Sequence, residues 1–427
     1  MKSQIHVDHE LLAVESEHRV HAMLEVTAPD VEKGDRPPLH VALVIDRSGS
    51  MSGGKLAAAK NAARFLVERL DATDSLALVA FDHEVRLLAA AAAPDKQKLA
   101  GVIDSIPSGG TTNLSGGWLK GAEELRRVTA EGTRRVLLLT DGLANVGVTD
   151  PGRLSGMAQS MRGERISTTT IGYGDGFDEA LLTAMADAGG GNSYFAAGPD
   201  DAPGIFEDEF EGLASVAAQN VSLEIRASDD VKFVGVLNEY PIVLVPGGVQ
   251  VQLGDFYGSE TRRIVFEMNV PNVADLGPKQ IGELVLRYTS VGDTIEMHDV
   301  TIPVTVNVVD ADTAAAADIN TDVNDEVLLL RTAEARREAM KRADSGDFDG
   351  AAEALSSVRS AVSFAMPASS RADDLRSELD ELDYSTERMR QRTYDALERK
   401  RMHYQSHRNL RSRDRKEWKN PDEEEPW

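Results

Sequence analysis

The chain has 427 residues, of which 41% are hydrophobic and 27% charged, and its formal net charge is −25. This length predicts two or three domains, because single hydrophobic cores stop growing at about 250–300 residues. The negative charge disfavours a nucleic-acid partner for the whole molecule, since phosphate is repelled, and it fits either a solvated acidic surface or cation binding. The absence of cysteine excludes disulfides and thiolate metal sites.

Targeting signals are missing from the sequence. The first ten residues contain no apolar run of the kind that a signal peptide needs. Nowhere do eighteen consecutive apolar residues occur, so we expect no membrane span. A cytoplasmic location is therefore the expectation.

In chain order, weak alternation over residues 4–28 predicts two strands, and from 39 to about 215 strands alternate with helices. Short apolar runs predict buried strands at His40–Asp46, Ser75–Phe81, Arg135–Thr140, Ile166–Ile171 and Ser193–Ala196. Helical spacing predicts helices at Lys55–Leu70, Pro94–Ile106, Ser115–Val128, 151–162, Phe177–Ala188 and 203–217. Strands joined through helices make right-handed crossovers, so this region is predicted to be an α/β domain with a doubly wound, mainly parallel sheet.

From about residue 219 the period becomes two, which predicts a β-sandwich. The N-terminal strands have no partners of their own, so we expect them to join this sandwich, with the α/β domain inserted between its strands. After Asp310 the pattern is helical, with a helical hairpin followed by one helix from about 370 to 416. The expected domains are 1–37 (N-terminal strands of the sandwich), 38–217 (α/β domain), 218–312 (sandwich), 318–417 (α-helical region) and 418–427 (disordered acidic tail).

Oxygen-bearing side chains follow three segments of the predicted α/β domain. They are Asp46, Ser48 and Ser50 directly after the first buried strand, Thr112 in the Gly-rich loop before a helix, and Asp141 directly after the RVLLLT strand. In an open α/β sheet, ligands collect outside the carboxyl ends of the strands, so we expect these side chains to converge. An oxygen-only set suits a hard cation, with Mg²⁺ first and Mn²⁺ or Ca²⁺ as alternatives.

Taken together, Asp46-x-Ser48-x-Ser50, Thr112 and Asp141 in these contexts resemble the metal-ion-dependent adhesion site of the von Willebrand factor type A family. The resemblance extends over about residues 39–215. It implies a Rossmann-like fold in which the Ser48, Ser50 and Thr112 hydroxyls coordinate the ion, with Asp46 and Asp141 acting directly or through water. It also implies that an Asp or Glu of a protein partner fills the last coordination position, so that the chain is a metal-dependent protein-interaction module.

Each motif alone has a simpler explanation. Asp-x-Ser-x-Ser and Thr-Asp-Gly are frequent in turns, and the Gly-Thr-Thr-Asn loop can be a helix N-cap. Catalysis is not expected, because there is no Walker loop and His83 is the only histidine of the nine in the α/β core. A metal-dependent hydrolase remains an alternative, as does an accessory role beside AAA+ ATPases of the MoxR or chelatase type, with which bacterial relatives of this family work.

The C-terminal stretch from Arg388 to Lys416 is strongly basic. It has two interpretations: a helix that pairs with acidic faces of the same chain, or a surface that contacts RNA or another polyanion.

Overall fold

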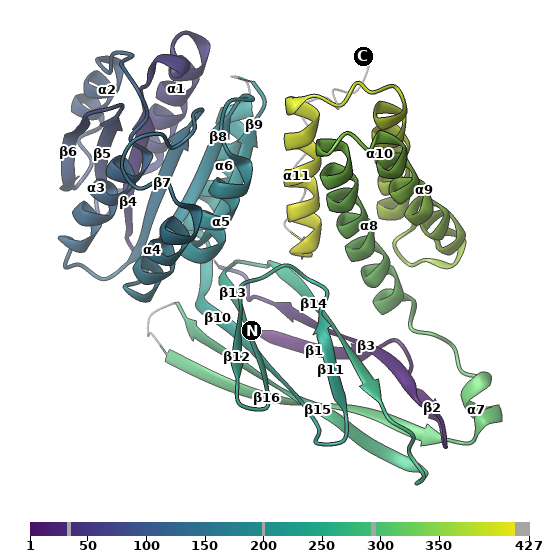
Figure 1. Cartoon of the computed structure of the whole chain (residues 1–427). Coiled ribbons are helices and arrows are strands. Elements are labelled where there is room, and N and C mark those ends of the chain that lie inside the picture. Colours follow the sequence, from purple (N-terminus) through teal and green to yellow (C-terminus); the bar gives the residue numbers. More distant parts are fainter. Residues whose placement is uncertain (32–35, 199–200, 292–295, 415–427) are drawn as a thin grey trace, which may run out of the picture.

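The computed structural model describes residues 1–31, 36–198, 201–291 and 296–414. It consists of an α/β domain, a domain of two β-sheets and a helical C-terminal region that lies beside the α/β domain (Figure 1). The acidic tail expected at 418–427 lies outside the described residues. None of the helices in the described part of the chain combines the length and the apolarity that a membrane crossing requires.

One mainly parallel sheet forms the centre of the α/β domain. In spatial order its strands are β6 (Val85–Ala92), β5 (Ser75–Phe81), β4 (Leu39–Asp46), β7 (Thr133–Thr140), β8 (Ile166–Tyr173) and β9 (Gly190–Ala196). In this sheet β6 is antiparallel to its neighbour β5, and all other neighbouring strands are parallel. Every residue of β4, β5 and β8 is buried, as expected for parallel strands covered on both faces.

Helices cover both faces of this sheet. Three helices pack on one face: α1 (Gly54–Arg69), α2 (Lys96–Asp104) and α6 (Asp201–Ala214). Three pack on the other: α3 (Leu114–Arg126), α4 (Pro151–Gly163) and α5 (Glu179–Gly189). The predicted doubly wound α/β architecture is therefore confirmed. A short 3₁₀ turn, η1 (Gly49–Met51), lies between β4 and α1.

Two glycines bring α3 unusually close to the sheet. A methyl group added at Gly117 would lie 2.5 Å from Phe81 Cδ1, and one added at Gly121 would lie 2.6 Å from Val44 Cγ2. Asn113 caps the helix by accepting a 3.0 Å hydrogen bond from the backbone nitrogen of Gly116. This close packing holds the loop before α3 beside the carboxyl ends of β4 and β5.

The second domain consists of two sheets around one hydrophobic core. The first sheet has the order β1 (Lys2–Val7), β3 (His18–Thr27), β14 (Thr261–Val270) and β11 (Lys232–Val236). The second has the order β12 (Ile242–Val245), β13 (Gly248–Tyr257), β10 (Val216–Ala227), β15 (Gly277–Ser290), β16 (Glu296–Val309) and β2 (Leu11–Ala13). Because β3 pairs with β14, strands from before and after the α/β domain share one sheet.

The C-terminal region contains α7 (Ala311–Ala315), α8 (Thr321–Asp344), α9 (Phe348–Ala365), η2 (Met366–Ala368), α10 (Ala372–Arg390) and α11 (Ala396–Leu410). The predicted single helix over 370–416 is wrong. Arg392 has a left-handed φ of 55°, and Asp395 begins α11 as an N-cap by accepting from the backbone nitrogen of Glu398. The region expected to be helical over 318–417 also contains a strand, β17 (Arg413–Asp414), because these residues pair with β14.

The basic C-terminal segment contacts acidic groups of the same chain. Lys400 Nζ lies 2.6 Å from Glu179 Oε2, Arg411 lies 2.6 Å from Asp187, and Arg413 lies 2.6 Å from Glu260. These contacts favour the interpretation in which the segment pairs internally. They also tie α11 and β17 to both other domains.

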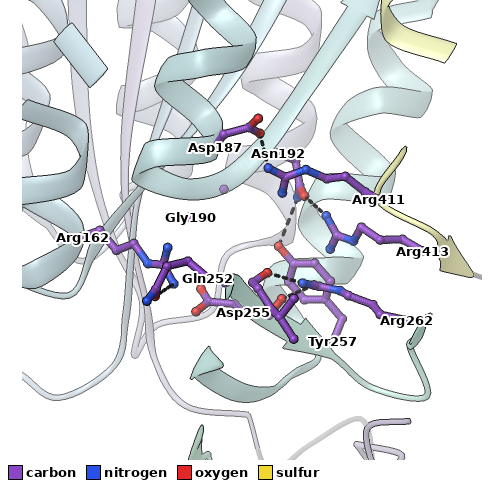
Figure 2. A pocket seen from close by; sticks show the side chains of 13 residues that line it. Arg162, Asp187, Gly190, Asn192, Gln252, Asp255, Tyr257, Arg262, Arg411 and Arg413 are labelled. Carbon is purple, nitrogen blue, oxygen red and sulfur yellow. Dashed lines mark hydrogen bonds and ion pairs between the residues drawn. The ribbon is translucent and has the colours of Figure 1, made fainter. Parts of the chain in front are cut away.

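A polar junction joins the three parts of the molecule (Figure 2). Arg135 of β7 has no exposed surface and contacts Glu209 of α6 at 3.3 Å and Asp255 of β13 at 3.2 Å. Arg413 donates to Asn192 at 2.7 Å across the same junction. Arg135 lies near the amino end of β7, so the two-sheet domain is attached at the edge of the parallel sheet opposite to the carboxyl ends of its strands. The two-sheet domain therefore leaves the carboxyl edge uncovered, and α11 contacts this edge in the loop after β8, where Lys400 Nζ donates to the Phe177 carbonyl at 2.6 Å.

Candidate metal centre

Asp46, the last residue of β4, lies at the centre of the carboxyl edge. Its side chain is fully buried. Oδ1 accepts a 2.8 Å hydrogen bond from the backbone nitrogen of Ser48, and Oδ2 accepts a 2.6 Å bond from Thr140 Oγ1. Burial raises the pKa of Asp46 and the nearby Asp141 carboxylate adds to the increase, while the hydrogen bonds from Thr140 and Ser48 oppose it. A cation beside the two carboxylates would relieve this repulsion.

The second carboxylate reaches the same place from β7. Ser50 Oγ donates to Asp141 Oδ1 at 2.7 Å, and the Ser48 and Ser50 hydroxyl oxygens lie 3.1 Å apart. Asp141 is 1% exposed and follows directly after Thr140. Two residues that are 91 positions apart in the chain, Ser50 and Asp141, thus meet at this edge, and Ser48 lies beside Ser50.

Thr112 completes the group from the loop before α3. A methyl group added to Gly142 would lie 3.0 Å from Thr112 Oγ1, 3.7 Å from Ser50 Oγ and 3.8 Å from Asp46 Oδ2. One point beside Gly142 is therefore within 4 Å of oxygens from the loop before α3 and the loop after β4, and the hydrogen bond from Ser50 to Asp141 Oδ1 links the third loop to them. Thr112 is buried, whereas its neighbour Thr111 is exposed.

The structure brings together all five side chains that the sequence indicated: Asp46, Ser48, Ser50, Thr112 and Asp141. Two carboxylates and three hydroxyls form an oxygen-only set, and the Gly142 backbone leaves space beside it. This donor set fits a hard divalent cation such as Mg²⁺. Among the described residues, no group of three His, Asp or Glu side chains converges, so no carboxylate-rich or imidazole site competes with it there.

Sequence reasoning missed a lysine in contact with this group. Lys55, at the start of α1, places Nζ 2.6 Å from Asp141 Oδ2. Its side chain is 33% exposed, while the Asp141 carboxylate is fully buried. No short motif signals this contact, because it depends on how α1 begins above the end of β7.

A buried ion pair beneath the site was missed as well. Arg47 Nη2 lies 2.8 Å from Asp82 Oδ2, and both residues are buried. Asp82 Oδ2 also accepts from the backbone nitrogen of Gly110 at 3.0 Å, and the Asp82 carbonyl accepts from Asn113 at 2.8 Å. The pair therefore connects the loop after β4, the loop after β5 and the loop that carries Thr112.

A further hydrogen-bonded contact fixes Thr112 from the other side. Asn145 Oδ1 accepts from the backbone nitrogen of Thr112 at 3.1 Å, and the Asn145 backbone nitrogen donates to the Thr112 carbonyl at 3.4 Å. Thr112 is thus positioned by the loop that follows Asp141. The three oxygen-bearing loops are cross-linked to one another by hydrogen bonds between backbone and side chains.

Fold and site together define a doubly wound α/β domain with an oxygen-rich group at the carboxyl edge of its sheet, where α/β domains bind ligands. Residues 40–208 match the family model of the von Willebrand factor type A domain, and the chain contains a domain of this family.

Two relatives are similar over different shares of their length. The chain is 26% identical over 344 residues to the Synechocystis sp. protein sll0103, and this match covers 78% of the chain and 80% of the relative. It is 28% identical over 215 residues to YfbK of Escherichia coli, a match that covers 49% of the chain and 37% of the relative.

Two solved structures resemble the whole chain. One is a von Willebrand factor type A protein from Catenulispora acidiphila, with a TM-score of 0.68, 21% identity and coverage of 91% of this chain and 89% of that one. The other is the ArnB paralog VWA2 from Sulfolobus acidocaldarius, with a TM-score of 0.63, 18% identity and coverage of 96% and 98%. Both likenesses support the fold.

Proposed function

We propose that this chain is a divalent-cation-dependent protein-binding module. Its candidate metal centre would hold Mg²⁺, with Mn²⁺ or Ca²⁺ as alternatives, through the hydroxyls of Ser48, Ser50 and Thr112 and the carboxylates of Asp46 and Asp141. The observation that carries the proposal is the convergence of side-chain oxygens from three loops: Thr112, Ser50 and Asp46 place oxygens within 4 Å of one point beside Gly142, and Ser50 Oγ donates to Asp141 Oδ1 at 2.7 Å. When bound, the ion supplies a site of positive charge for an Asp or Glu side chain of a partner protein.

The donor set supports binding to an anion from outside. Only two carboxylates face a double positive charge, and the three hydroxyls are neutral, so the ion keeps its attraction for a further carboxylate. In a partly dry interface this attraction exceeds that of an exposed salt bridge. The position of the site, at the edge of the sheet away from the two-sheet domain, leaves it accessible to another protein.

We propose that the site binds and does not catalyse. Both carboxylates are already engaged, Asp46 with Ser48 and Thr140, and Asp141 with Ser50 and Lys55. A general base needs a free lone pair within reach of the proton that it takes. When the ion is bound, the lone pairs that these hydrogen bonds leave free on Asp46 and Asp141 would face the cation, so neither carboxylate would take a proton from a substrate.

Exposed apolar side chains beside the site indicate which residues of the partner lie next to its acidic group. Leu143 and Val146, in the loop after Asp141, are 55% and 36% exposed. Apolar side chains at the rim of a charged site favour a partner that carries a hydrophobic residue next to its acidic one.

The replacement Asp46→Ala tests the metal site. At Mg²⁺ concentrations about one hundred times the Kd, binding should raise the free energy of unfolding of the wild-type protein by about 2.7 kcal/mol. This raises the Tm of a domain of this size by about 5–10 °C. Asp46→Ala should lose this increase while remaining folded in EDTA. Asp380→Ala is the control, because Asp380 is exposed on α10 and should leave the Mg²⁺ response unchanged.

A pulldown tests the partner role. Capture of the partner by the wild-type protein should depend on Mg²⁺, disappear in EDTA and be absent for Asp46→Ala. Leu143→Ser should weaken capture and leave the Mg²⁺-dependent Tm increase intact. An identical Mg²⁺ response of wild type and Asp46→Ala would refute the assignment of the site.

A further inference from the structure

Among the ion pairs of the described residues, one involves a carboxylate of the candidate metal centre: Lys55 pairs with Asp141. Its Nζ lies 2.6 Å from Asp141 Oδ2, while Asp141 Oδ1 accepts from Ser50. The two carboxylate oxygens of Asp141 are therefore taken by one hydroxyl and one ammonium group. With Lys55 counted, the net charge of the two carboxylates falls from −2 to −1.

The start of α1 is an unfavourable place for a lysine. The N-terminal turn of a helix carries a partial positive charge, which favours acidic side chains and disfavours basic ones. The first turn of α1 contains no acidic residue to offset Lys55. The contact with Asp141 is thus the compensating interaction that the structure shows.

The loop after β8 confines the lysine side chain over the site. A methyl group added to Gly174 would lie 3.1 Å from Lys55 Cε and 3.2 Å from Nζ. Gly174 has a φ of 66°, a conformation that glycine adopts without strain. A glycine at this position leaves the room in which the ammonium group reaches Asp141, and one third of the side chain stays open to solvent.

We propose that Lys55 is an internal counter-cation that occupies Asp141 when no divalent ion is bound and competes with the ion for that carboxylate. This inference rests on the proposed metal site. The Lys55 ammonium group already lies at hydrogen-bonding distance from Asp141 Oδ2. A divalent ion that bound the same carboxylate would lie close to this positive charge, and like charges this close repel strongly where water is excluded. Lys55 therefore stabilises the metal-free protein and lowers the affinity for the ion.

The replacement Lys55→Gln separates this role from that of a structural brace, because the two roles predict opposite changes in metal affinity. Loss of the competing charge should tighten Mg²⁺ binding about tenfold, measured by calorimetry. The same change should lower the Tm in EDTA, since Asp141 then faces Asp46 without a counter-charge. A brace would instead lose both stability and metal affinity.

Two matched variants complete the experiment. Lys55→Arg retains the charge and should keep a Mg²⁺ affinity close to that of the wild type. Lys60→Gln, on the same helix, removes a lysine that donates to the Asp104 carbonyl and should leave both readouts unchanged. Equal Mg²⁺ affinity of wild type and Lys55→Gln, or weaker binding by the variant, overturns the role of Lys55 alone. Absence of Mg²⁺, Mn²⁺ and Ca²⁺ binding in both proteins overturns the metal site itself.

Discussion

Asp82 supports the candidate metal centre without belonging to its ligands, and replacing it with asparagine tests that role. Asp82 pairs with Arg47 at 2.8 Å and accepts backbone hydrogen bonds from Gly110 at 3.0 Å and Glu84 at 2.8 Å. Burial would raise the pKa of Asp82, but these backbone hydrogen bonds and the Arg47 charge outweigh it and the pKa is lowered. The folded protein therefore holds Asp82 as a carboxylate.

Asp82→Asn leaves the Arg47 guanidinium buried without a counter-charge. Breaking a buried ion pair by removing one partner costs about 3–5 kcal/mol. Each kcal/mol shifts the Tm of a domain of this size by about 2–4 °C, so the α/β domain should melt about 6–20 °C lower. Mg²⁺ affinity should fall too, because Gly110, in the loop that carries Thr112, loses its carboxylate acceptor.

Thermal unfolding of the α/β domain can be followed through Trp118. This side chain has no exposed surface and packs in the same core as Phe81. Replacing the other two tryptophans of the chain, Trp418 and Trp427, with phenylalanine isolates its fluorescence.

Two further variants make the reasoning refutable. Glu84→Gln, which removes an exposed pair with Arg86, should shift the Tm by no more than about 1–2 °C. Combining Asp82→Asn with Arg47→Met removes both charges and should recover most of the loss. A single Asp82→Asn variant within about 2 °C of wild type, or a double variant no more stable than the single one, would contradict the account.

The remaining predictions concern packing and pH. Gly117→Ala should destabilise the protein by about 1–3 kcal/mol, because the added methyl group lies 2.5 Å from Phe81. Gly101→Ala in α2 should instead stabilise the protein by up to about 1 kcal/mol, because no atom lies within 4 Å of the added methyl group. Urea unfolding of both variants checks that the two changes have opposite signs. Burial, together with the charges of His407 and Arg337, lowers the pKa of His403 to about 3. Since the unfolded histidine titrates near 6.5, the unfolded state binds more protons between these values, and stability should fall by up to about 2 kcal/mol from pH 7 to pH 5. His403→Gln should remove this part of the pH dependence of the Tm; an unchanged slope would show that His403 is not its source.

Much of the α/β domain could be predicted from the sequence, because its signals are local. A run such as Val41–Ile45 is short and apolar at every position, which is typical of a strand buried on both faces. Once the strands are parallel, their carboxyl ends meet at one edge. This rule is enough to expect Asp46 and Asp141 near one another, and Ser50 of the loop after Asp46 donates to Asp141 Oδ1. Thr112 precedes a helix, so its place beside them was indicated by the resemblance to the family motif and not by strand direction.

The groups that position or compete with these oxygens could not be predicted in the same way. Lys55 reads as an ordinary surface residue of an amphipathic helix until α1 is placed against β7. Arg47 and Asp82 follow two different strands. Arg47 occupies a variable position of the Asp46-x-Ser48-x-Ser50 motif, and Asp82 belongs to no recognisable motif. Their contacts depend on how loops cross in space, which neither periodicity nor spacing encodes.

The sequence by itself determined which segments of the α/β domain are strands and helices and which oxygen-bearing residues share an edge, since hydrophobic period and strand direction are properties of short segments. Only the tertiary structure decided where the C-terminal segment goes. The helical pattern there predicted one helix, but Arg392 adopts a left-handed conformation and Arg413 joins β14, where it pairs with Glu260. The partners of Arg413, β14 and Glu260, come from a distant part of the chain and are invisible to any local pattern.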